Sequence, residues 1–452
     1  MSVSDVQGQL QELADDVIAS VGAHRSDAEA NVSVTRTRHG LTRFANSFIH
    51  QHVGEDTREV RLTLAIEGRT ATASTTDTDP EGLRQLVERT LTSAEVQPVD
   101  PTWPGATPRV DVSGTGNLDP ATADAAPGDR AQLVKAFVDE GPGLRAAGFV
   151  DTATTEAAFA STAGQRVSGA ATRATLDGIH QTATSAGSGH ATSFRLSELD
   201  AAAAGARAAD LARRSERAVD IDPGTYPVVL MPEAVATVLT FIAVYGFNGK
   251  AHHEGASFAE IGEQQFDPSI TITADPSDPR SLGLPFDAEG SPRRRYPLVA
   301  DGITENLAHD RRTAQVVGAT TTGDALPGGE GFGAMPGTVV LRPGAATSDQ
   351  MIASVERGLL VTQFHYCRIL DPKSQVVTGL TRNGTFLIED GQVTGAVGNL
   401  RFTQSFTAAL GEGQVLQLGG DDRYASGDFG EGMIIAPSLQ LAGWNFTGGA
   451  KG

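Results

Sequence analysis

The first 97 residues alternate between helical and strand-like patterns. Residues 4–22 carry valine and leucine every three or four positions after a Ser/Asp start, which predicts an amphipathic helix. Alternating apolar and polar residues then predict strands at 31–40, 43–52 and 60–74, the last segment containing a hairpin turn at 67–69. A second helix is expected at 79–95, because Asp79 suits its N-cap and Pro80 its first turn.

The same order of elements recurs after a long connection. Residues 97–129 are rich in Pro, Gly, Asp and Thr and have no hydrophobic period, so they predict a linker. Beyond it we expect a helix at 130–141, Thr/Ala-rich strands between 148 and 196, and an Ala-rich helix at 197–219. The pattern predicts an N-terminal α+β domain, residues 1–222, built from two helix–sheet–helix units at 1–97 and 130–219 and joined by the Pro/Gly-rich linker.

The second half has one long helical pattern and many short strand patterns. Pro and Gly at 220–227 mark a boundary, and the apolar segment 232–247 predicts a helix that Pro232 opens. Short apolar–polar segments with DG and NG turns fill most of the remainder. They predict a β-rich domain at 223–452, an antiparallel barrel or sandwich. The expected fold class is therefore α+β, a helix/antiparallel-sheet domain followed by a β-rich domain.

Composition narrows the function classes. The chain has 55 acidic and 35 basic residues, a net charge of -20, which disfavours direct binding to nucleic acid. Its longest apolar run, 234–247, is too short to span a bilayer, and the acidic N-terminal stretch differs from a secretory signal. The single cysteine, Cys367, rules out an internal disulfide. We expect a cytoplasmic protein with no membrane partner.

The stretch AHHEGASF at 251–258 is the most conspicuous candidate for metal chemistry. His252 and His253 precede Glu254, but a zinc-binding helix needs a second histidine four residues after the first, on the same helix face. The residues at that spacing are Ala256 and Ser257, which are poor zinc ligands, and Gly255 weakens a helix. The stretch is predicted to be a polar loop without a metal.

Two weaker candidates lie further along the chain. Arg293 and Arg294 follow the acidic stretch PFDAEG, and their charge-assisted hydrogen bonds could hold a peptide C-terminus or another acidic group, although a solvated turn suits them equally well. His365 and Cys367 would point the same way on a strand. They leave open one weak alternative, a metal site built from His253, Glu254, His365 and Cys367.

Four strings carry a resemblance that covers nearly the whole chain. They are TRFANSFIHQ at 42–51, GASFAEIGEQ at 255–264, LPFDAEGSPRRR at 284–295 and GTFLIEDGQVTGAVGNLRFTQS at 384–405. Together, in this order, they resemble the TldD/PmbA family, once described as modulators of DNA gyrase and regarded as cytosolic peptidases of peptides or unfolded chains.

The resemblance implies a division of labour between two branches. In the TldD branch, the helix after a VVL-type strand carries His-Glu and a second His, and a later cysteine completes a zinc site. Here the corresponding helix, 232–247, contains no histidine, and its only acidic residue is Glu233. The chain therefore resembles the metal-free PmbA/TldE branch. It is expected to have no cofactor of its own and to pair with a TldD-type zinc peptidase subunit, or with itself, in a homo- or heterodimer.

In such a pair, this chain would help to shape the peptide cavity. An exposed strand edge in the β-rich domain could hold an extended peptide by strand addition. The expected cavity wall comprises His252, His253, Glu254, Ser257, Thr385, Phe386 and Leu387, with Arg293 and Arg294 as further candidates. Two alternatives remain open: a self-sufficient hydrolase that uses the histidine loop with His365 and Cys367, and a noncatalytic regulator that contacts DNA gyrase or another protein.

Overall fold

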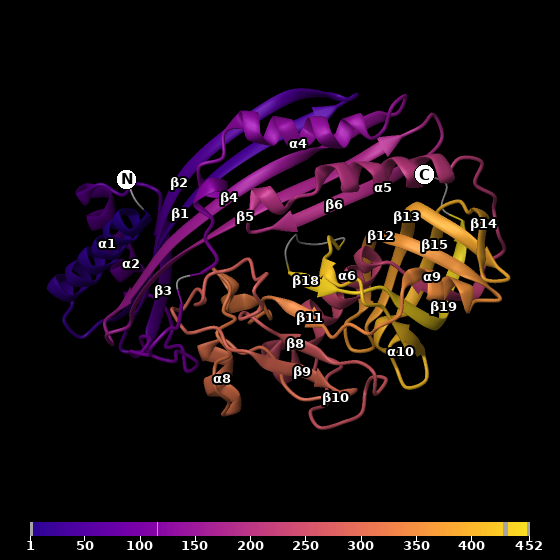
Figure 1. Ribbon diagram of the computed structural model, residues 1–452. Coiled ribbons are helices and arrows are strands. Elements are labelled where there is room, and N and C mark those ends of the chain that lie inside the picture. Colours follow the sequence, from indigo (N-terminus) through magenta and orange to yellow (C-terminus); the bar gives the residue numbers. More distant parts are fainter. Residues whose placement is uncertain (1–2, 115, 428–432, 450–452) are drawn as a thin grey trace.

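The computed structural model describes residues 3–114, 116–427 and 433–449, and in these ranges the strands form three sheets (Figure 1). One six-stranded sheet arches across the molecule, and a barrel and a small third sheet lie beneath it. Helices are combined with one antiparallel sheet and two sheets that are mainly antiparallel, which confirms the expected α+β class. No helix in the described part of the chain is both long and apolar enough to cross a bilayer.

The arching sheet has six antiparallel strands in the order β3-β2-β1-β4-β5-β6. The strands are β1 (Glu29–Ala45), β2 (Phe48–Ile66), β3 (Arg69–Thr75), β4 (Arg145–Ser161), β5 (Arg166–Gln181) and β6 (Ala186–Ser193). The expected turn after β2 is confirmed at Glu67 and Gly68, which have φ of 51° and 75°. The strand predicted at 43–52 is wrong, because Asn46 and Ser47 adopt φ of 51° and 66° and form a turn inside it.

Two pairs of helices cover the outer face of this sheet (Figure 1). At one end, α1 (Val3–His24) and α2 (Pro80–Glu95) pack on β1, β2 and β3 around Val32, Leu62 and Leu64. The Asp79 side chain accepts from the Gly82 N–H, as the predicted N-cap requires. At the other end lie α4 (Pro127–Asp139) and α5 (Ala201–Arg214). The predicted linker 97–129 also contains a short helix, α3 (Pro120–Ala123).

Small residues bring α5 unusually close to strand β6. A side chain on Gly189 of β6 would place its Cβ 2.1 Å from the carbonyl oxygen of Ala204 on α5. On the other side of the helix, a Cβ on Gly205 would lie 2.4 Å from the carbonyl oxygen of Phe137 on α4. Alanine and glycine therefore allow the helix backbone to lie almost on the sheet. This packing places Arg207 of α5 beside His190 of β6.

The barrel is formed by a seven-stranded sheet that closes on itself. Strand β12 pairs with both β7 and β13, so β12, β7, β19, β15 and β13 complete a ring. The strands are β7 (Gly224–Leu230), β12 (Arg357–Asp371), β13 (Val376–Glu389), β14 (Gln392–Ala396), β15 (Leu400–Ser405), β16 (Val415–Leu418) and β19 (Leu439–Gly449). Closure agrees with the predicted barrel, although the β7–β12 pair is parallel.

Helix α6 (Pro232–Phe241) is the predicted long helix, and every one of its residues is buried. It ends in a π-helical turn (Ile242–Gly246) and is followed by α7 (Gly249–His253). The third sheet consists of β8 (Ile272–Ala274), β9 (Tyr296–Ala300), β10 (Ile303–Thr304), β11 (Val339–Leu341), β17 (Arg423–Tyr424) and β18 (Ile434–Ala436). The remaining short helices are α8 (Arg311–Val317), α9 (Ser348–Ala353) and α10 (Phe406–Ala409). The helix, the barrel and this sheet share the largest apolar core.

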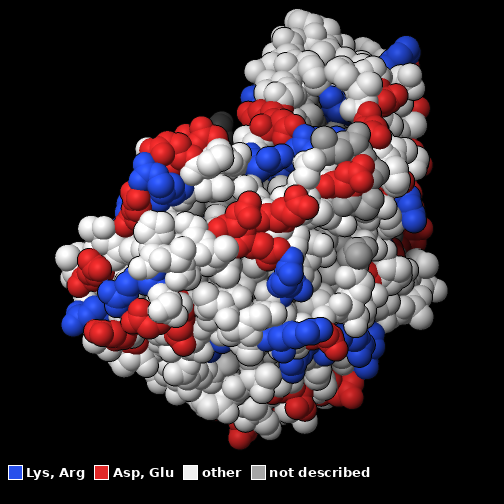
Figure 2. Space-filling view, turned by 90° about the vertical axis from the view of Figure 1, so that its left-hand side faces the viewer, with Lys and Arg blue, Asp and Glu red and all other residues white. Residues whose placement is uncertain are grey.

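Charged side chains of both signs interleave on the surface at the N-terminal end (Figure 2). On α2, for example, Arg84 lies 2.5 Å from carboxylate oxygens of both Glu81 and Glu88. Such exposed pairs contribute little to stability. They do mean that part of the chain's negative charge is locally compensated.

Candidate functional site

A set of charged groups surrounds a cavity of about 520 Å³ between α5, β6, the start of α6, and β12. We call this the Glu233 cavity. Glu233 is 9% exposed and stands in the first turn of α6. The Nη2 atom of Arg423, on β17, lies 3.0 and 3.1 Å from its two carboxylate oxygens. Burial opposes the charge, but Arg423 and His190 hold the pKa of Glu233 below its ordinary value.

His190 forms a second charged pair at the cavity wall. Its Nδ1 lies 3.2 Å from an Asp177 carboxylate oxygen, and its Nε2 lies 3.4 Å from Oε1 of Gln363 on β12. Burial disfavours the imidazolium, yet Asp177 and Glu233 raise the pKa of His190 to about 9. At neutral pH the histidine is therefore a cation. It links the arching sheet to the barrel.

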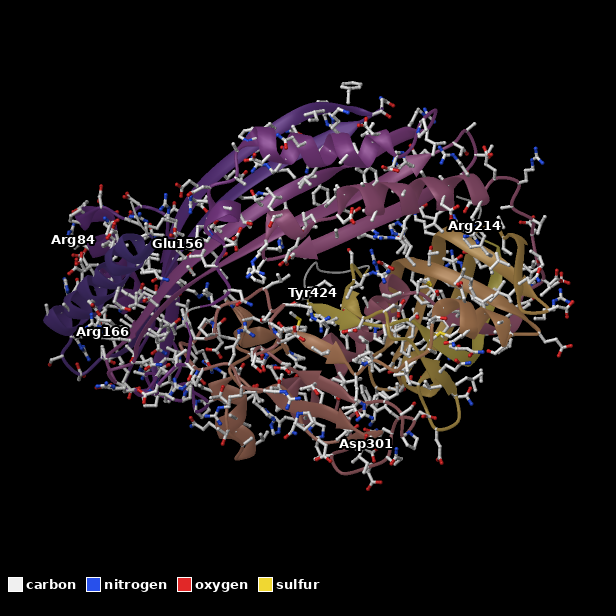
Figure 3. All side chains as sticks on the ribbon, in the orientation of Figure 1. Arg84, Glu156, Arg166, Arg214, Asp301 and Tyr424 are labelled. Atoms are coloured by element: carbon white, nitrogen blue, oxygen red, sulfur yellow. The ribbon has the colours of Figure 1, made fainter. Side chains whose placement is uncertain are left out.

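Two arginines of α5 line the mouth of the Glu233 cavity. Arg207 donates from Nη2 to the carbonyl oxygen of His190 at 3.0 Å. Arg214, at the end of α5 that faces the barrel (Figure 3), pairs with Asp210 at 3.1 Å and stacks 4.7 Å from the centre of the Phe386 ring. The cavity thus combines a neutralised carboxylate at its base with exposed guanidinium groups at its entrance.

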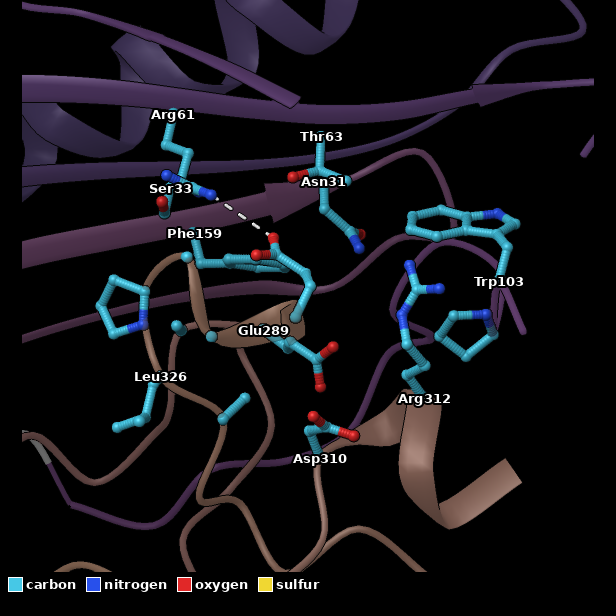
Figure 4. Close-up of a pocket in the computed structure, with 17 residues that line it drawn as sticks. Asn31, Ser33, Arg61, Thr63, Trp103, Phe159, Glu289, Asp310, Arg312 and Leu326 are labelled. Carbon is cyan, nitrogen blue, oxygen red and sulfur yellow. Dashed lines mark hydrogen bonds and ion pairs between the residues drawn. The ribbon is translucent and has the colours of Figure 1, made fainter. Parts of the chain in front are cut away.

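A larger groove, of about 710 Å³, lies between the inner face of the arching sheet and two loops, 282–288 and 325–327. Alternate residues of β1, including Ser33, Thr35 and Thr37, form part of its sheet wall, and residues of β2, β4 and β5 form the rest. At one side it continues into a pocket of about 60 Å³ lined by Arg61, Glu289 and other residues (Figure 4). Arg61 lies 3.4 Å from Glu330 there.

The loop wall of the groove is held by a buried carboxylate, Asp287. It accepts hydrogen bonds from the backbone N–H groups of Glu289 and Ser291, each at 2.9 Å, and of Ala325 at 3.0 Å. Burial raises the pKa of Asp287, and burial together with Asp287 raises the pKa of Glu289 to about 8. The Glu289 carboxyl group therefore holds its proton to a higher pH than a free glutamate side chain does.

The predicted histidine loop lies apart from the Glu233 cavity and the groove. The prediction of a loop is partly wrong, because Asn248 accepts from the N–H groups of Lys250 and Ala251 and starts the short helix α7. His252 and His253 are exposed on it, and Glu254 forms an ion pair with Lys250. Ser257 is 8% exposed and donates to the Gly246 carbonyl at 2.5 Å. The Ser257 hydroxyl is therefore engaged in fixing the backbone at Gly246.

The late-strand candidates lie inside the barrel wall. Thr385 and Phe386 are 2% and 1% exposed, and Leu387 packs against the main core. The expectation of a free strand edge here is wrong, since β13 pairs on one side with β12 and on the other with β14. Both edges of β13 are paired at these residues, so its backbone groups there are already used. Phe386 instead supports the cavity from behind, beneath Arg214.

The arginine and cysteine candidates are also accounted for. Arg293 borders the groove and lies 3.2 Å from Asp324, whereas Arg294 is exposed. Cys367 is fully buried, and His365 is half-buried. The expected common orientation of these two side chains is wrong, because a β-bulge with Tyr366 at φ 57° interrupts the alternation of the strand.

The residues of the Glu233 cavity were missed in the sequence as functional candidates. His190, Arg207, Glu233 and Arg423 come from four separate segments and belong to no spaced motif. The only local signal is an acidic residue that follows Pro232 at the start of an otherwise apolar helix. That signal also describes an ordinary helix N-terminus.

Comparison with known proteins identifies the class of the chain. The PmbA/TldA metallopeptidase C-terminal domain matches residues 223–448, half of the sequence. The chain therefore belongs to the TldD/PmbA family and is related to metallopeptidases.

Individual relatives match over shorter stretches. A metalloprotease TldD homolog of Haemophilus influenzae is 28% identical over 182 residues, which cover 39% of this chain and 37% of that protein. A TldD homolog of Buchnera aphidicola is 24% identical over 210 residues, covering 44% of this chain and 41% of that protein. The chain thus spans about two fifths of the length of these curated relatives.

Solved structures match over nearly the whole chain. TldE from Thermococcus kodakarensis has a TM-score of 0.86 at 18% identity and covers 96% of this chain and 100% of its own. A Thermotoga maritima protein described as a proposed modulator of a DNA gyrase has a TM-score of 0.84 at 18% identity, with coverage of 96% and 99%. At this level of identity the match shows a common fold.

A metallopeptidase domain implies a metal, and the Glu233 cavity does not fit one. Both oxygens of the Glu233 carboxylate are bonded to Arg423, and its neighbours Arg207 and protonated His190 would repel a cation. Across residues 3–114, 116–427 and 433–449, no three His, Cys, Asp or Glu side chains are grouped to hold an ion. We therefore assign no metal to this cavity and derive no reaction step through one.

Proposed function

We propose that this chain is the metal-free subunit of a two-chain cytoplasmic peptidase and acts beside a zinc peptidase of the same family. The observation that carries the proposal is the Glu233–Arg423 pair at the start of α6. In the TldD branch this helix is expected to carry the zinc-binding histidines. Here the helix begins with Pro232 and Glu233, and the Glu233 carboxylate forms an ion pair with Arg423. The similarity in fold to an archaeal TldE supports the same assignment.

In this proposal the partner provides the metal and the activated water, and this chain contributes binding surface. The groove under the arching sheet, of about 710 Å³, mixes polar and apolar side chains, many of them small, which suits a peptide of varied sequence. Part of its loop wall, including Asp287, lies within the 284–295 string that carries part of the family resemblance. Loss of this wall would alter substrate binding without changing the metal site of the partner.

The experiment measures zinc and peptide cleavage in the same samples. Plasma emission should find no stoichiometric zinc in the purified chain, and cleavage of an unstructured peptide should need added zinc peptidase partner. Glu233→Gln should leave the lone chain as inactive as before. Stoichiometric zinc together with chelator-sensitive cleavage by the lone chain, abolished by Glu233→Gln, would overturn the proposal in favour of a self-sufficient hydrolase.

A further inference from the structure

One cation of the Glu233 cavity has no acidic partner. Three arginines line this cavity, and Arg214 pairs with Asp210 while Arg423 pairs with Glu233. Among the described residues, no carboxylate lies within ion-pair distance of Arg207, whose Nη2 bonds only to the carbonyl oxygen of His190. A guanidinium has five N–H donors, so Arg207 can still offer a bidentate contact to an anion.

The surroundings of Arg207 favour the arrival of an anion. Partial burial lowers the pKa of Arg207, and the positive charge of Arg423 lowers it further. The two guanidinium groups therefore repel each other across the cavity. The Glu233 carboxylate relieves this repulsion only in part, because Arg423 already holds both of its oxygens. The carboxylate of Asp200 also attracts Arg207, and the guanidinium keeps N–H donors for an incoming carboxylate.

The same cavity also has an apolar surface. Side chains from five different segments provide this surface: Leu211, Met231, Ile352, Leu360 and Val393. Leu211 and Met231 pack against the small core cluster that contains Phe386, so this wall has support behind it. A volume of about 520 Å³ is within the range of small-ligand sites, which combine an apolar lining with a few placed polar groups.

We infer that the Glu233 cavity binds the C-terminal residue of a peptide, with its free carboxylate on Arg207 and its apolar side chain against Leu211, Ile352 and Val393. This inference deepens the proposed function, on which it rests, by naming the end of the peptide that the subunit recognises. His190 assists by presenting its carbonyl oxygen to Arg207, which fixes the guanidinium. Side-chain amides of Gln363 and Gln392 are placed to meet the last peptide groups.

The test measures binding of fluorescein-labelled Gly-Gly-Ala-Leu to the chain alone by fluorescence anisotropy. The peptide with a free C-terminus should bind about tenfold more tightly than its C-terminal amide, the loss expected for one charge-assisted hydrogen-bonded pair. Arg207→Gln should weaken binding of the free acid by a similar factor and remove the preference over the amide. Replacement of the last leucine by glycine should also weaken binding about tenfold.

Arg213→Gln is the matched control. Arg213 follows on the same helix, is exposed, and donates to the Pro142 carbonyl at 3.2 Å. Its loss should leave both affinities unchanged. Circular dichroism checks that each variant is folded. If the Arg207→Gln variant is unfolded, the inference is tested by comparing the binding of the free acid and the amide to the unaltered chain.

Three outcomes overturn the inference: equal affinity for free acid and amide, unchanged binding by Arg207→Gln, or equally tight binding of an amidated peptide that ends in aspartate. The last would show recognition of any carboxylate rather than of the chain end. These outcomes are separate from failure of the proposed function. If the chain prefers the free acid but does not stimulate the zinc peptidase, the inferred binding site stands and the subunit role is refuted. If the chain stimulates the zinc peptidase but does not prefer the free acid, the subunit role stands and the inferred binding site is refuted.

Discussion

The pKa values of two buried carboxylate sites in this protein are shifted in opposite directions. Glu233 is buried beside Arg423 and His190, and its pKa lies below the ordinary value. Asp287 and Glu289 are buried beside each other, and their pKa values are raised. Burial acts in the same direction at both sites, so the neighbouring charges decide the outcome. The side-chain type alone does not tell whether an acid will be ionised in the folded chain.

The two sites also differ in the sequence distance of their partners. Glu233 depends on an arginine 190 residues further along the chain. Asp287 accepts two of its three backbone hydrogen bonds from residues within four positions. The first site therefore joins distant parts of the fold, whereas the second mainly stabilises one turn. The following changes would break or sharpen this contrast.

Arg423→Met should have the largest effect on stability. It leaves the Glu233 carboxylate buried without its main counter-charge, and we expect the free energy of unfolding to fall by about 3 kcal/mol. Chemical denaturation measures the change. The matched control, Arg342→Met, breaks an exposed pair with Asp301 and should cost less than about 0.5 kcal/mol. If adding Glu233→Gln to Arg423→Met restores no stability, the assigned cause is wrong.

Asp287→Asn should cost somewhat less, about 2 kcal/mol in the free energy of unfolding. The asparagine amide retains one acceptor oxygen. Its NH₂ group replaces the other oxygen and faces a backbone N–H that donates to the carboxylate in the unaltered chain, so two donors face each other. Denaturation of the variant beside Asp301→Asn gives the comparison, since Asp301 is exposed and should tolerate the change. Equal stability of both variants would contradict a structural role for Asp287.

Glu289→Gln should change the dependence of stability on pH. The folded-state pKa of Glu289 is raised to about 8 from an ordinary 4.5, so the folded chain holds a proton that the unfolded chain releases. The resulting stability is complete below about pH 4.5 and is lost as pH rises through about 8. The glutamine variant should lose less stability over this interval. Denaturation at several pH values gives the slope of unfolding free energy against pH for the unaltered chain and for the variant. Equal slopes would refute the raised pKa of Glu289.

Glu254→Gln should have the smallest effect, less than about 0.5 kcal/mol in the free energy of unfolding. Its ion pair with Lys250 is exposed on α7, and the side chain is 54% accessible. Chemical denaturation of the variant measures its stability, and a zinc-binding measurement tests whether Glu254 is a metal ligand. A large loss of stability, or loss of a bound zinc ion, would restore the histidine stretch as a functional site.

Local features of the fold were predictable from the sequence because their causes are local. Asp79 and Pro80 start a helix, and Glu67-Gly68 allows a tight turn, whatever the rest of the chain does. The turn at Asn46-Ser47 was missed because the residues around it continue the apolar–polar alternation of the flanking strands. Closure of the barrel could be expected only as a possibility, since it joins strands from opposite ends of this region.

The Glu233 cavity was less predictable. The family resemblance indicates which helix matters and that its histidines are absent, but it does not indicate that Arg423 replaces a metal as the partner of Glu233. Likewise, the close approach that places Arg207 beside His190 depends on Gly189 fitting against Ala204, a contact between two segments with no shared pattern. Charges gathered by tertiary packing leave no periodic signal.

The closed barrel has a consequence for the order of folding during synthesis. Strand β7 ends at Leu230, and one of its two neighbours, β19, begins only at Leu439. All six strands of the arching sheet end by Ser193, and helix α5, which packs on it, ends at Arg214, so this part can form while translation continues. In the meantime one edge of β7 has no partner and is open to wrong pairing. Ribosome-bound chains that stop before β19 should therefore depend on chaperones although their first sheet is already complete.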